Sequence, residues 1–382
     1  MAWEVPFFDL VLGEEEKLAA LRVINSNWLT AGPTIAEFET DFSAALDTDL
    51  QAVAVSSATA ALHLSLLALG VGPGDEVIVP SLTFVACANA IRYVGATPVF
   101  ADVTSELDWN ISPADVASKI TPRTRAIMVM HYAGYGCAID RFADLAQLNG
   151  LLLIEDCSHA ALGTWKGKSL GTFGDTGCFS FYSNKNMTTG EGGMVISRNP
   201  ELIERFRILR SHGITASTYQ RFKGHAYGYD VAELGYNYRL DEIRAAIGIE
   251  QLRKLPGFNV QRKERVERYQ RLIAEKLPQV RVPFTGHNDG ASYHIFPVLL
   301  PGDEEVRSNT LRGMAGRGIQ CSMHYRPIHT FSAYQGAVAD VPITDRIAPS
   351  ILTLPLFPTL TDAQMDQVVE GLQTCLEGGS RN

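Results

Sequence analysis

The 382-residue chain lacks long apolar runs and has no excess of basic residues. No stretch of about 18 apolar residues occurs, so we expect no transmembrane helix. The first ten residues include Glu4 and Asp9 and lack a basic segment followed by an apolar one, so we expect no secretory signal. The formal net charge of −9 disfavours nucleic acid or an acidic membrane as the main partner.

The sequence also lacks paired cysteine motifs. Its six cysteines are scattered singly and none forms a CxxC pair; they are Cys87, Cys137, Cys157, Cys178, Cys321 and Cys375. This pattern predicts neither a disulfide framework nor a metal site, and it predicts buried free thiols in a reducing cytoplasm.

From residue 51 onward, apolar strands alternate with helices. We expect strands at 51–56, 76–80, 97–103, 125–132 and 151–156, with helices at 14–26, 34–46, 59–69, 84–93, 113–120 and 140–148. The strands are continuously apolar rather than alternating. Strands that are apolar on both faces and separated by helices indicate an α/β fold, with a mostly parallel central sheet covered by helices on both faces.

The second half of the chain follows a different pattern. We expect strands at 177–182 and 193–197, then helices at 200–211, 241–255 and 259–276, the last two separated at Pro256 and Gly257. Beyond residue 280, strands and helices alternate again. We therefore predict a large domain over residues 1–250 and a smaller C-terminal α/β domain over residues 251–382.

Two glycine-rich segments resemble nucleotide-binding motifs, but neither matches its motif in full. The run from Gly70 to Gly74 follows a helix and precedes a strand, whereas a dinucleotide loop needs the opposite order. Gly167-Lys168-Ser169 resembles the end of a P-loop, but the first glycine of that motif would fall on Leu162.

Ser57, Ala58 and Thr59 follow a predicted strand and open a predicted helix. A helix N-terminus offers free backbone N–H groups and the positive end of the helix dipole, and nearby hydroxyls add donors. The segment is a candidate phosphate site. An ordinary helix cap is the alternative, since serine and threonine also cap helices well.

Glu155 and Asp156 end the apolar strand at 151–156, and His159 follows. The carboxyl edge of an open α/β sheet is where ligands bind. A buried carboxylate needs a cation or hydrogen-bond donors, and a protonated pyridine nitrogen would serve. The alternatives are a helix-capping acid and a structural histidine.

Lys185 follows the apolar run from Cys178 to Tyr182 and precedes the polar turn that ends at Gly193. At the end of a buried strand, desolvation lowers the pKa of a lysine, as carbonyl chemistry at the amine requires. The alternative is a solvated lysine in a hairpin.

Together and in this order, these segments resemble the DegT/DnrJ/EryC1/StrS family of sugar aminotransferases. Further segments carry the same resemblance over nearly the whole chain: Trp28-Leu29-Thr30-Ala31-Gly32-Pro33, Pro80-Ser81-Leu82-Thr83-Phe84, Gly235-Tyr236-Asn237-Tyr238-Arg239-Leu240 and His324-Tyr325-Arg326-Pro327-Ile328-His329. The resemblance implies fold type I, the aspartate aminotransferase-like architecture, with pyridoxal 5′-phosphate (PLP) as cofactor and its pyridoxamine form in the half-reaction.

The resemblance also implies a role for each candidate residue. Lys185 matches the lysine that binds the cofactor covalently, Asp156 the partner of the pyridine nitrogen, and His159 a residue stacked on one cofactor face. Phe84 matches an aromatic on the other face. Ser57, Ala58, Thr59 and Ser180 match phosphate ligands, and Asn237 a residue that reaches the phosphate of the other subunit, which implies a homodimer with shared active sites. No metal is implied.

The family acts on keto-sugars, which implies glutamate as amino donor and a nucleotide-activated sugar as acceptor. Thr188-Thr189-Gly190-Glu191-Gly192-Gly193 after the lysine, together with His159, favours amination at C4 of a 4-keto-6-deoxyhexose. Amination at C3, or of a cyclitol, is an alternative within the family. A cofactor-binding regulator without turnover is an alternative from another class, disfavoured by the intact Lys185, Asp156 and Ser180.

Overall fold

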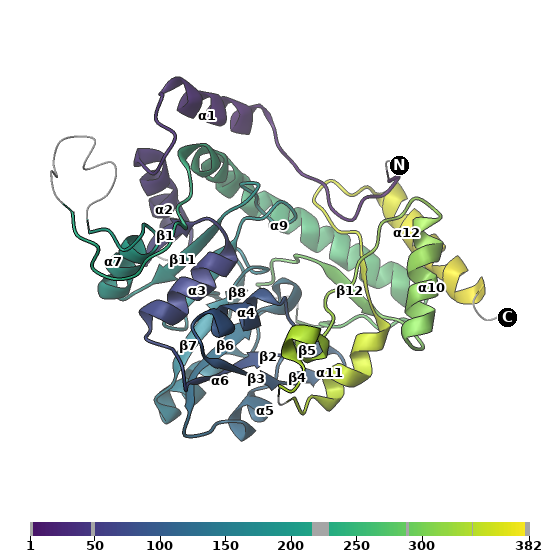
Figure 1. Ribbon diagram of the computed structural model, residues 1–382. Helices are drawn as coiled ribbons and strands as arrows, with labels where there is room; N and C mark the ends of the chain where they lie inside the picture. Colours follow the sequence, from purple (N-terminus) through teal and green to yellow (C-terminus); the bar gives the residue numbers. More distant parts are fainter. Residues whose placement is uncertain (1–2, 47–49, 216–228, 288–289, 338, 379–382) are drawn as a thin grey trace.

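A seven-stranded sheet forms the centre of the protein (Figure 1). The computed structural model describes residues 3–46, 50–215, 229–287, 290–337 and 339–378. In order across the sheet, the strands are β1 (Gln51–Val55), β11 (Gly193–Ser197), β10 (Thr176–Ser180), β7 (Leu152–Asp156), β6 (Thr124–Met130), β2 (Glu76–Pro80) and β3 (Thr97–Ala101).

The sheet is mostly parallel, as predicted. Strands β10, β7, β6, β2 and β3 pair in parallel, whereas β11 runs antiparallel to both β10 and β1. The carboxyl ends of the parallel strands, and the turns that follow them, therefore lie along one edge.

Helices cover both faces of this sheet, because its strands are apolar on both sides. Val53 and Val55 of β1 pack toward one face with α3 (Ala58–Ala68), α4 (Ala86–Tyr93) and α7 (Pro200–Leu209). Ala52 and Ala54 pack toward the other with α2 (Pro33–Leu46), α6 (Ile139–Asn149) and the first half of α9 (Glu242–Lys276). This arrangement confirms the predicted fold class.

The C-terminal region adds a small antiparallel pair, β12 (Phe296–Leu299) and β13 (Ile351–Leu354), with α10 (Glu304–Ala315) and α12 (Asp362–Gly378) beside it (Figure 1). Among the described residues, the remaining elements are α1 (Glu14–Asn25), α5 (Pro113–Ser118), α11 (Pro342–Ile347), two hairpins and four short 3-10 segments. The hairpins pair β4 (Val103–Ser105) with β5 (Asp108–Ile111) and β8 (Thr164–Trp165) with β9 (Lys168–Ser169). The 3-10 segments are η1 (Tyr132–Gly134), η2 (Ile328–Thr330), η3 (Ser332–Tyr334) and η4 (Ala348–Ser350).

The prediction of two helices separated at Pro256 and Gly257 is wrong, because α9 is continuous over 35 residues. Proline removes one backbone donor from a helix. Buried Leu252, Leu255 and Phe258 lie on both sides of it, and this packing outweighs the local loss. The helix contacts α1 and α2 at one end and α12 at the other, so the predicted domain boundary at residue 250 falls within it and stays a prediction.

Two further sequence expectations concern membranes and cysteines. Within the described ranges, the structure contains no helix with the length and apolar character needed to cross a bilayer. All six cysteines are free, as expected, but only four are buried; Cys321 and Cys375 are partly exposed.

Candidate active site

A cavity of about 270 Å³ opens at the edge of the sheet where the parallel strands end. Eight of the nine predicted site residues line it: Ser57, Ala58, Thr59, Phe84, Asp156, His159, Ser180 and Lys185. A larger groove of about 550 Å³ lies between α1, α2 and α9, but it holds none of the predicted residues. We therefore place the candidate active site in the smaller cavity.

The N-terminus of α3 forms one end of this cavity. Ser57 caps the helix, because its side chain accepts the N–H of Ala60 at 3.2 Å. The N–H groups of Ala58 and Thr59 precede the first intrahelical bond, which Ala61 donates to the carbonyl of Ser57, so neither has an acceptor within the helix. Gly193 permits the close approach of β11 to this turn, since a Cβ there would lie 2.5 Å from the carbonyl carbon of Ser57. The turn can hold a phosphate.

Asp156 lies at the carboxyl end of β7 and is 3% exposed. One carboxylate oxygen accepts the backbone N–H of Ser158 at 2.9 Å, and the other accepts the thiol of Cys87 at 3.0 Å. Burial and the negative charge of Asp156 raise the pKa of Cys87 well above its usual value, so the thiol stays protonated. A carboxylate has about four acceptor sites, so Asp156 retains capacity for a cationic N–H of a ligand.

Lys185 follows β10 and reaches the same cavity. Its side chain is partly accessible, but its amine lies 3.4 Å from Nε2 of the buried His294. Burial of the amine lowers the pKa of Lys185 from 10.5 to about 8, although the charge of Asp156 opposes the shift. An amine with this pKa is neutral in a substantial fraction of molecules near physiological pH, as nucleophilic and base chemistry requires.

His159 is buried against Tyr325 in the cavity wall. The backbone N–H of Ala133 donates to Nδ1 of His159 at 3.3 Å, so the ring proton of the neutral imidazole is on Nε2, which donates to the hydroxyl of Tyr325 at 2.8 Å. Burial, with the charge of Lys185 as a second cause, holds the pKa of His159 well below its usual value. The ring is thus a neutral, fixed surface.

Of the other predicted residues, Phe84 and Ser180 line the same cavity and Asn237 does not. Phe84 is 53% exposed at the cavity mouth, with its ring centroid 6.0 Å from that of Tyr325. Ser180 is buried at the end of β10. Asn237 is exposed and lies outside the cavity of its own chain. The segment that contains Asn237 lies beside the turn that opens α3, since the backbone N–H of Ser56 donates to the carbonyl of Tyr238 at 2.8 Å.

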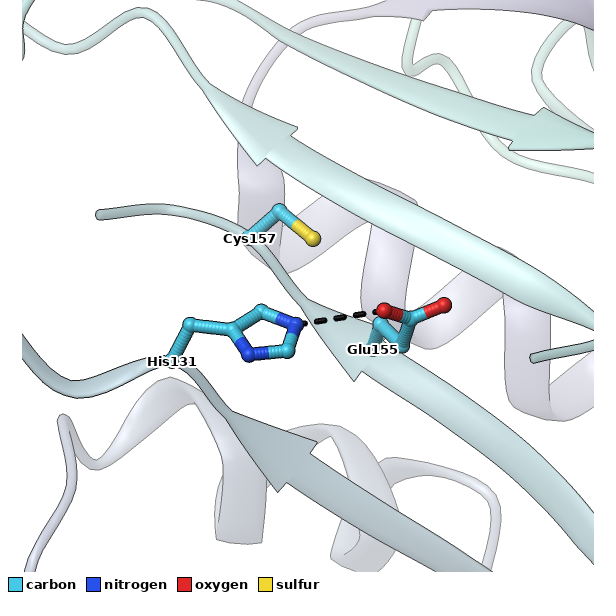
Figure 2. Close-up of side chains that lie close together, drawn as sticks. All are labelled: His131, Glu155 and Cys157. Carbon is cyan, nitrogen blue, oxygen red and sulfur yellow. Dashed lines mark hydrogen bonds and ion pairs between the residues drawn. The ribbon is translucent and has the colours of Figure 1, made fainter. Parts of the chain in front are cut away.

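Glu155, the other acid at the end of β7, belongs to a structural network rather than to the cavity. It accepts the backbone N–H groups of Gly171, Phe173 and Gly174 at 2.7–2.8 Å. Figure 2 shows it beside His131 and Cys157, three potential metal ligands. The N–H of Cys137 donates to Nδ1 of His131, which places the imidazole proton on Nε2, toward Glu155 at 3.2 Å.

This hydrogen bonding makes the trio a poor metal site. Nε2 of His131 carries a proton and offers no lone pair to an ion. Burial and the charge of Glu155 raise the pKa of Cys157 well above its usual value, and a thiol must be deprotonated to bind a metal. Glu155 instead fixes the loop at residues 171–174.

Sequence reasoning missed several cavity residues. Tyr182, Asn184, Glu191, His324 and Tyr325 also line it. His324 and Tyr325 belong to a segment that carries the family resemblance, but no role could be given to them, because they lie far from Lys185 along the chain. The amide oxygen of Asn184 is buried and has no hydrogen-bond partner among the described residues. These side chains give the mouth a polar and aromatic lining suited to a hydroxylated ligand.

Known proteins resemble this chain over nearly its whole length. The model of the DegT/DnrJ/EryC1/StrS aminotransferase family matches residues 11–373. The chain belongs to this family. It is 36% identical over 385 residues to the spore coat polysaccharide biosynthesis protein SpsC of Bacillus subtilis, covering 98% of this chain and 97% of SpsC.

Two solved structures illustrate the likeness. The aminotransferase TlmJ of Streptoalloteichus hindustanus superposes with a TM-score of 0.90 at 37% identity, covering 98% of this chain and 100% of TlmJ. The PLP form of Spr1654 of Streptococcus pneumoniae, a putative sugar aminotransferase, gives 0.90 at 29% identity, covering 99% of each chain. Spr1654 is also known in its PMP form. Aminotransferases of this family depend on PLP, which confirms the expected cofactor.

The residues of the cavity fit this cofactor. A helix N-terminus suits its phosphate, a buried carboxylate suits its pyridine nitrogen, and a lysine of lowered pKa suits its aldehyde. These three features lie in one cavity.

Proposed function

We propose that this protein transfers an amino group from glutamate to a nucleotide-activated keto-sugar, at C4 of a 4-keto-6-deoxyhexose, and that it works as a homodimer in the cytoplasm. The observation that carries the proposal is the meeting of Lys185, Asp156 and the N-terminus of α3 in a single cavity of a family aminotransferase. The intact Lys185, Asp156 and Ser180 disfavour a binding protein without turnover.

Bound PLP supplies an electron sink that stabilises negative charge at the reacting carbon. Ser57, Ala58, Thr59 and Ser180 would hold its phosphate, and Asp156 would keep the proton on its pyridine nitrogen. The neutral ring of His159 and the side chain of Phe84, which both line the cavity, would flank the cofactor.

Lys185 acts on the reacting carbons. Lys185 would bind the cofactor covalently in the resting enzyme, and its free amine would accept and return the substrate proton. The pKa of about 8 supports this second role, because a general base works best when its pKa lies near the operating pH.

The polar mouth supports a sugar as the acceptor. Asn184, Glu191 and His324 supply polar groups, and Tyr182 and Tyr325 supply aromatic surface. Glutamate as donor follows from the family pattern. A shared site in a homodimer rests on Asn237, which is exposed outside its own cavity.

Amination at C4 rests on the segment from Lys185 to Gly193 and on His159. Thr188 and Thr189 fix the course of this segment, by hydrogen bonds to the carbonyls of Phe181 and Glu191. Lys185, Glu191 and Gly192 of this segment line the cavity in which the sugar would react. Which carbonyl of the sugar reacts depends on its pose, because reaction needs atoms about 3–3.5 Å apart.

The test is the product formed from a nucleotide 4-keto-6-deoxyglucose and glutamate, analysed by proton NMR. We expect a C4 amine and stoichiometric 2-oxoglutarate. The Lys185→Ala variant is the matched control and should give neither. Turnover of a 3-keto isomer alone, or of a keto-cyclitol alone, would contradict the C4 assignment; release of no 2-oxoglutarate from glutamate would contradict the aminotransferase proposal itself.

A further inference from the structure

His294 is a buried histidine whose ring lies beside the amine of Lys185. It is 3% exposed, precedes β12, and is not part of the cavity lining in the described structure. Its Nε2 lies 3.4 Å from the amine of Lys185, and its ring centroid lies 4.3 Å from that of His159. The function proposed above gives this buried histidine no role.

The direction of each hydrogen bond around His294 follows from its partners. Nδ2 of Asn186 donates to the backbone carbonyl of Ser292 at 2.6 Å and to Oδ1 of Asn259 at 2.8 Å. Nδ2 of Asn259 donates in turn to the carbonyl of Ala161 at 3.1 Å. Because carbonyl oxygens only accept, both amide orientations are fixed.

The orientation of Asn186 sets the tautomer of His294. Oδ1 of Asn186 lies 3.0 Å from Nδ1 of His294, and an amide oxygen can only accept, so Nδ1 carries the ring proton. Burial is the main cause that holds the pKa of His294 well below its usual value, and the charge of Lys185 adds to it. The neutral ring therefore presents the lone pair of Nε2 to the lysine.

We propose that His294 is a positioning residue for Lys185: its Nε2 lone pair, fixed by the Asn186 amide, accepts an N–H of the lysine whenever the amine is free of the cofactor. A neutral amine that donates one N–H to His294 keeps its own lone pair directed elsewhere, toward the cavity. His294 thus keeps the released lysine in place between the two halves of the reaction. The inference rests on the proposed function and assigns a reason for the asparagine that follows the lysine.

Other titratable groups also act on the lysine and must be separated from His294. Asp156 and Cys87 raise the pKa of Lys185, against the larger effect of burial. Burial is the main cause that lowers the pKa of His159 and of His324, the latter to about 3, and the positive charge of Lys185 adds to it. None of these four groups touches Asn186 through a hydrogen bond in the described structure, so a change at Asn186 isolates the effect of His294.

The test measures the pKa of Lys185 in the cofactor-free full-length chain. Trace labelling with acetic anhydride across pH, with mass spectrometry of the Lys185 peptide, gives this pKa directly. We expect about 8 for the unchanged protein. His294→Leu removes the acceptor and should lower the pKa by about one pH unit, the equivalent of one hydrogen bond to a charged group.

Asn186→Leu is the decisive variant, because the side chain of Asn186 makes no hydrogen bond to the amine of Lys185 in the described structure. Without the amide oxygen, Nδ1 loses its acceptor, the ring proton moves to Nε2, and the pKa of Lys185 should fall as in His294→Leu. His294→Gln, which retains an acceptor oxygen, should restore most of the value. The control is His63→Phe, which should leave the pKa of Lys185 unchanged. His63 is a buried histidine in ring contact with Tyr93, Tyr236 and Tyr238.

An unchanged Lys185 pKa in folded Asn186→Leu would overturn the proposal, and thermal unfolding of each variant identifies the folded ones. If His294→Leu does not fold, Asn186→Leu and His294→Gln still decide. Reduction of the holoenzyme with borohydride separates this question from the proposed function. A cofactor label on Lys185 in these variants, with an unchanged lysine pKa, refutes only the role of His294, whereas no label in the unchanged protein refutes the proposed function.

Discussion

Replacing Asp156 with asparagine keeps the shape of the side chain and removes its charge. Oδ1 of the new amide can still accept the N–H of Ser158, so the end of β7 should keep its course. The amide nitrogen would replace the oxygen that now accepts the thiol of Cys87. More importantly, the proton on the pyridine nitrogen would lose its anionic partner.

The expected loss follows from burial. Asp156 is 3% exposed, so solvent cannot replace the missing charge. Removing one partner of a buried ion pair costs about 3–5 kcal/mol. Because each 1.36 kcal/mol corresponds to a factor of ten in rate, Asp156→Asn should slow the half-reaction by at least about a hundredfold. The cofactor should stay bound, through Lys185 and the N-terminus of α3.

The assay is single-turnover conversion of the bound cofactor by glutamate, followed by absorbance. Asp140→Asn is the matched control. Asp140 pairs with Lys166 on the surface, and surface pairs contribute little, so this variant should react at the normal rate. A rate for Asp156→Asn within a few-fold of the unchanged enzyme would refute the role assigned to this carboxylate.

Three further predictions concern Lys185, Gly193 and Asn237. Lys185→Met should raise the unfolding temperature of the cofactor-free chain at pH 7, because the pKa of Lys185 is about 8 in the folded state and 10.5 in the unfolded chain, so holding the proton destabilises the fold. The gain in unfolding temperature should shrink as the pH rises from about 8 to 10.5, and a gain that does not depend on pH would contradict the prediction. Gly193→Ala should weaken cofactor affinity, measured by titration of the cofactor-free chain, because its methyl group would displace Ser57; unaltered affinity would contradict this. Mixing Asn237→Ala and Lys185→Ala chains should regenerate one intact site per mixed dimer, and mixtures no more active than Asn237→Ala alone would exclude a shared site.

Much of the fold could be predicted because its strands are buried on both faces. Residues such as Val53 and Ala54 pack on opposite sides of the sheet and are both apolar, so the strand pattern is strong in the sequence. The hairpin of β4 and β5 was not predicted, because its strands are too short to show a period. The continuous α9 was not predicted either, because local rules at Pro256 do not include the packing of its neighbours.

Part of the candidate site could also be predicted from the sequence, and part of it could not. Ser57, Asp156 and Lys185 each follow or end a buried strand, and all such residues meet at one edge of a parallel sheet, so their meeting follows from topology. His294 stands 109 residues after Lys185, and nothing in its local sequence indicates that it reaches the lysine. Its contact depends on the C-terminal region packing against the sheet.

The central claim is that Lys185 binds the cofactor in this cavity, and chemical reduction tests it most directly. The holoenzyme is treated with sodium borohydride, digested, and mapped by mass spectrometry. We predict one cofactor label per chain, on the peptide containing Lys185, with no label in Lys185→Ala. A label on any other lysine, or no label on a chain that binds PLP, would contradict the account.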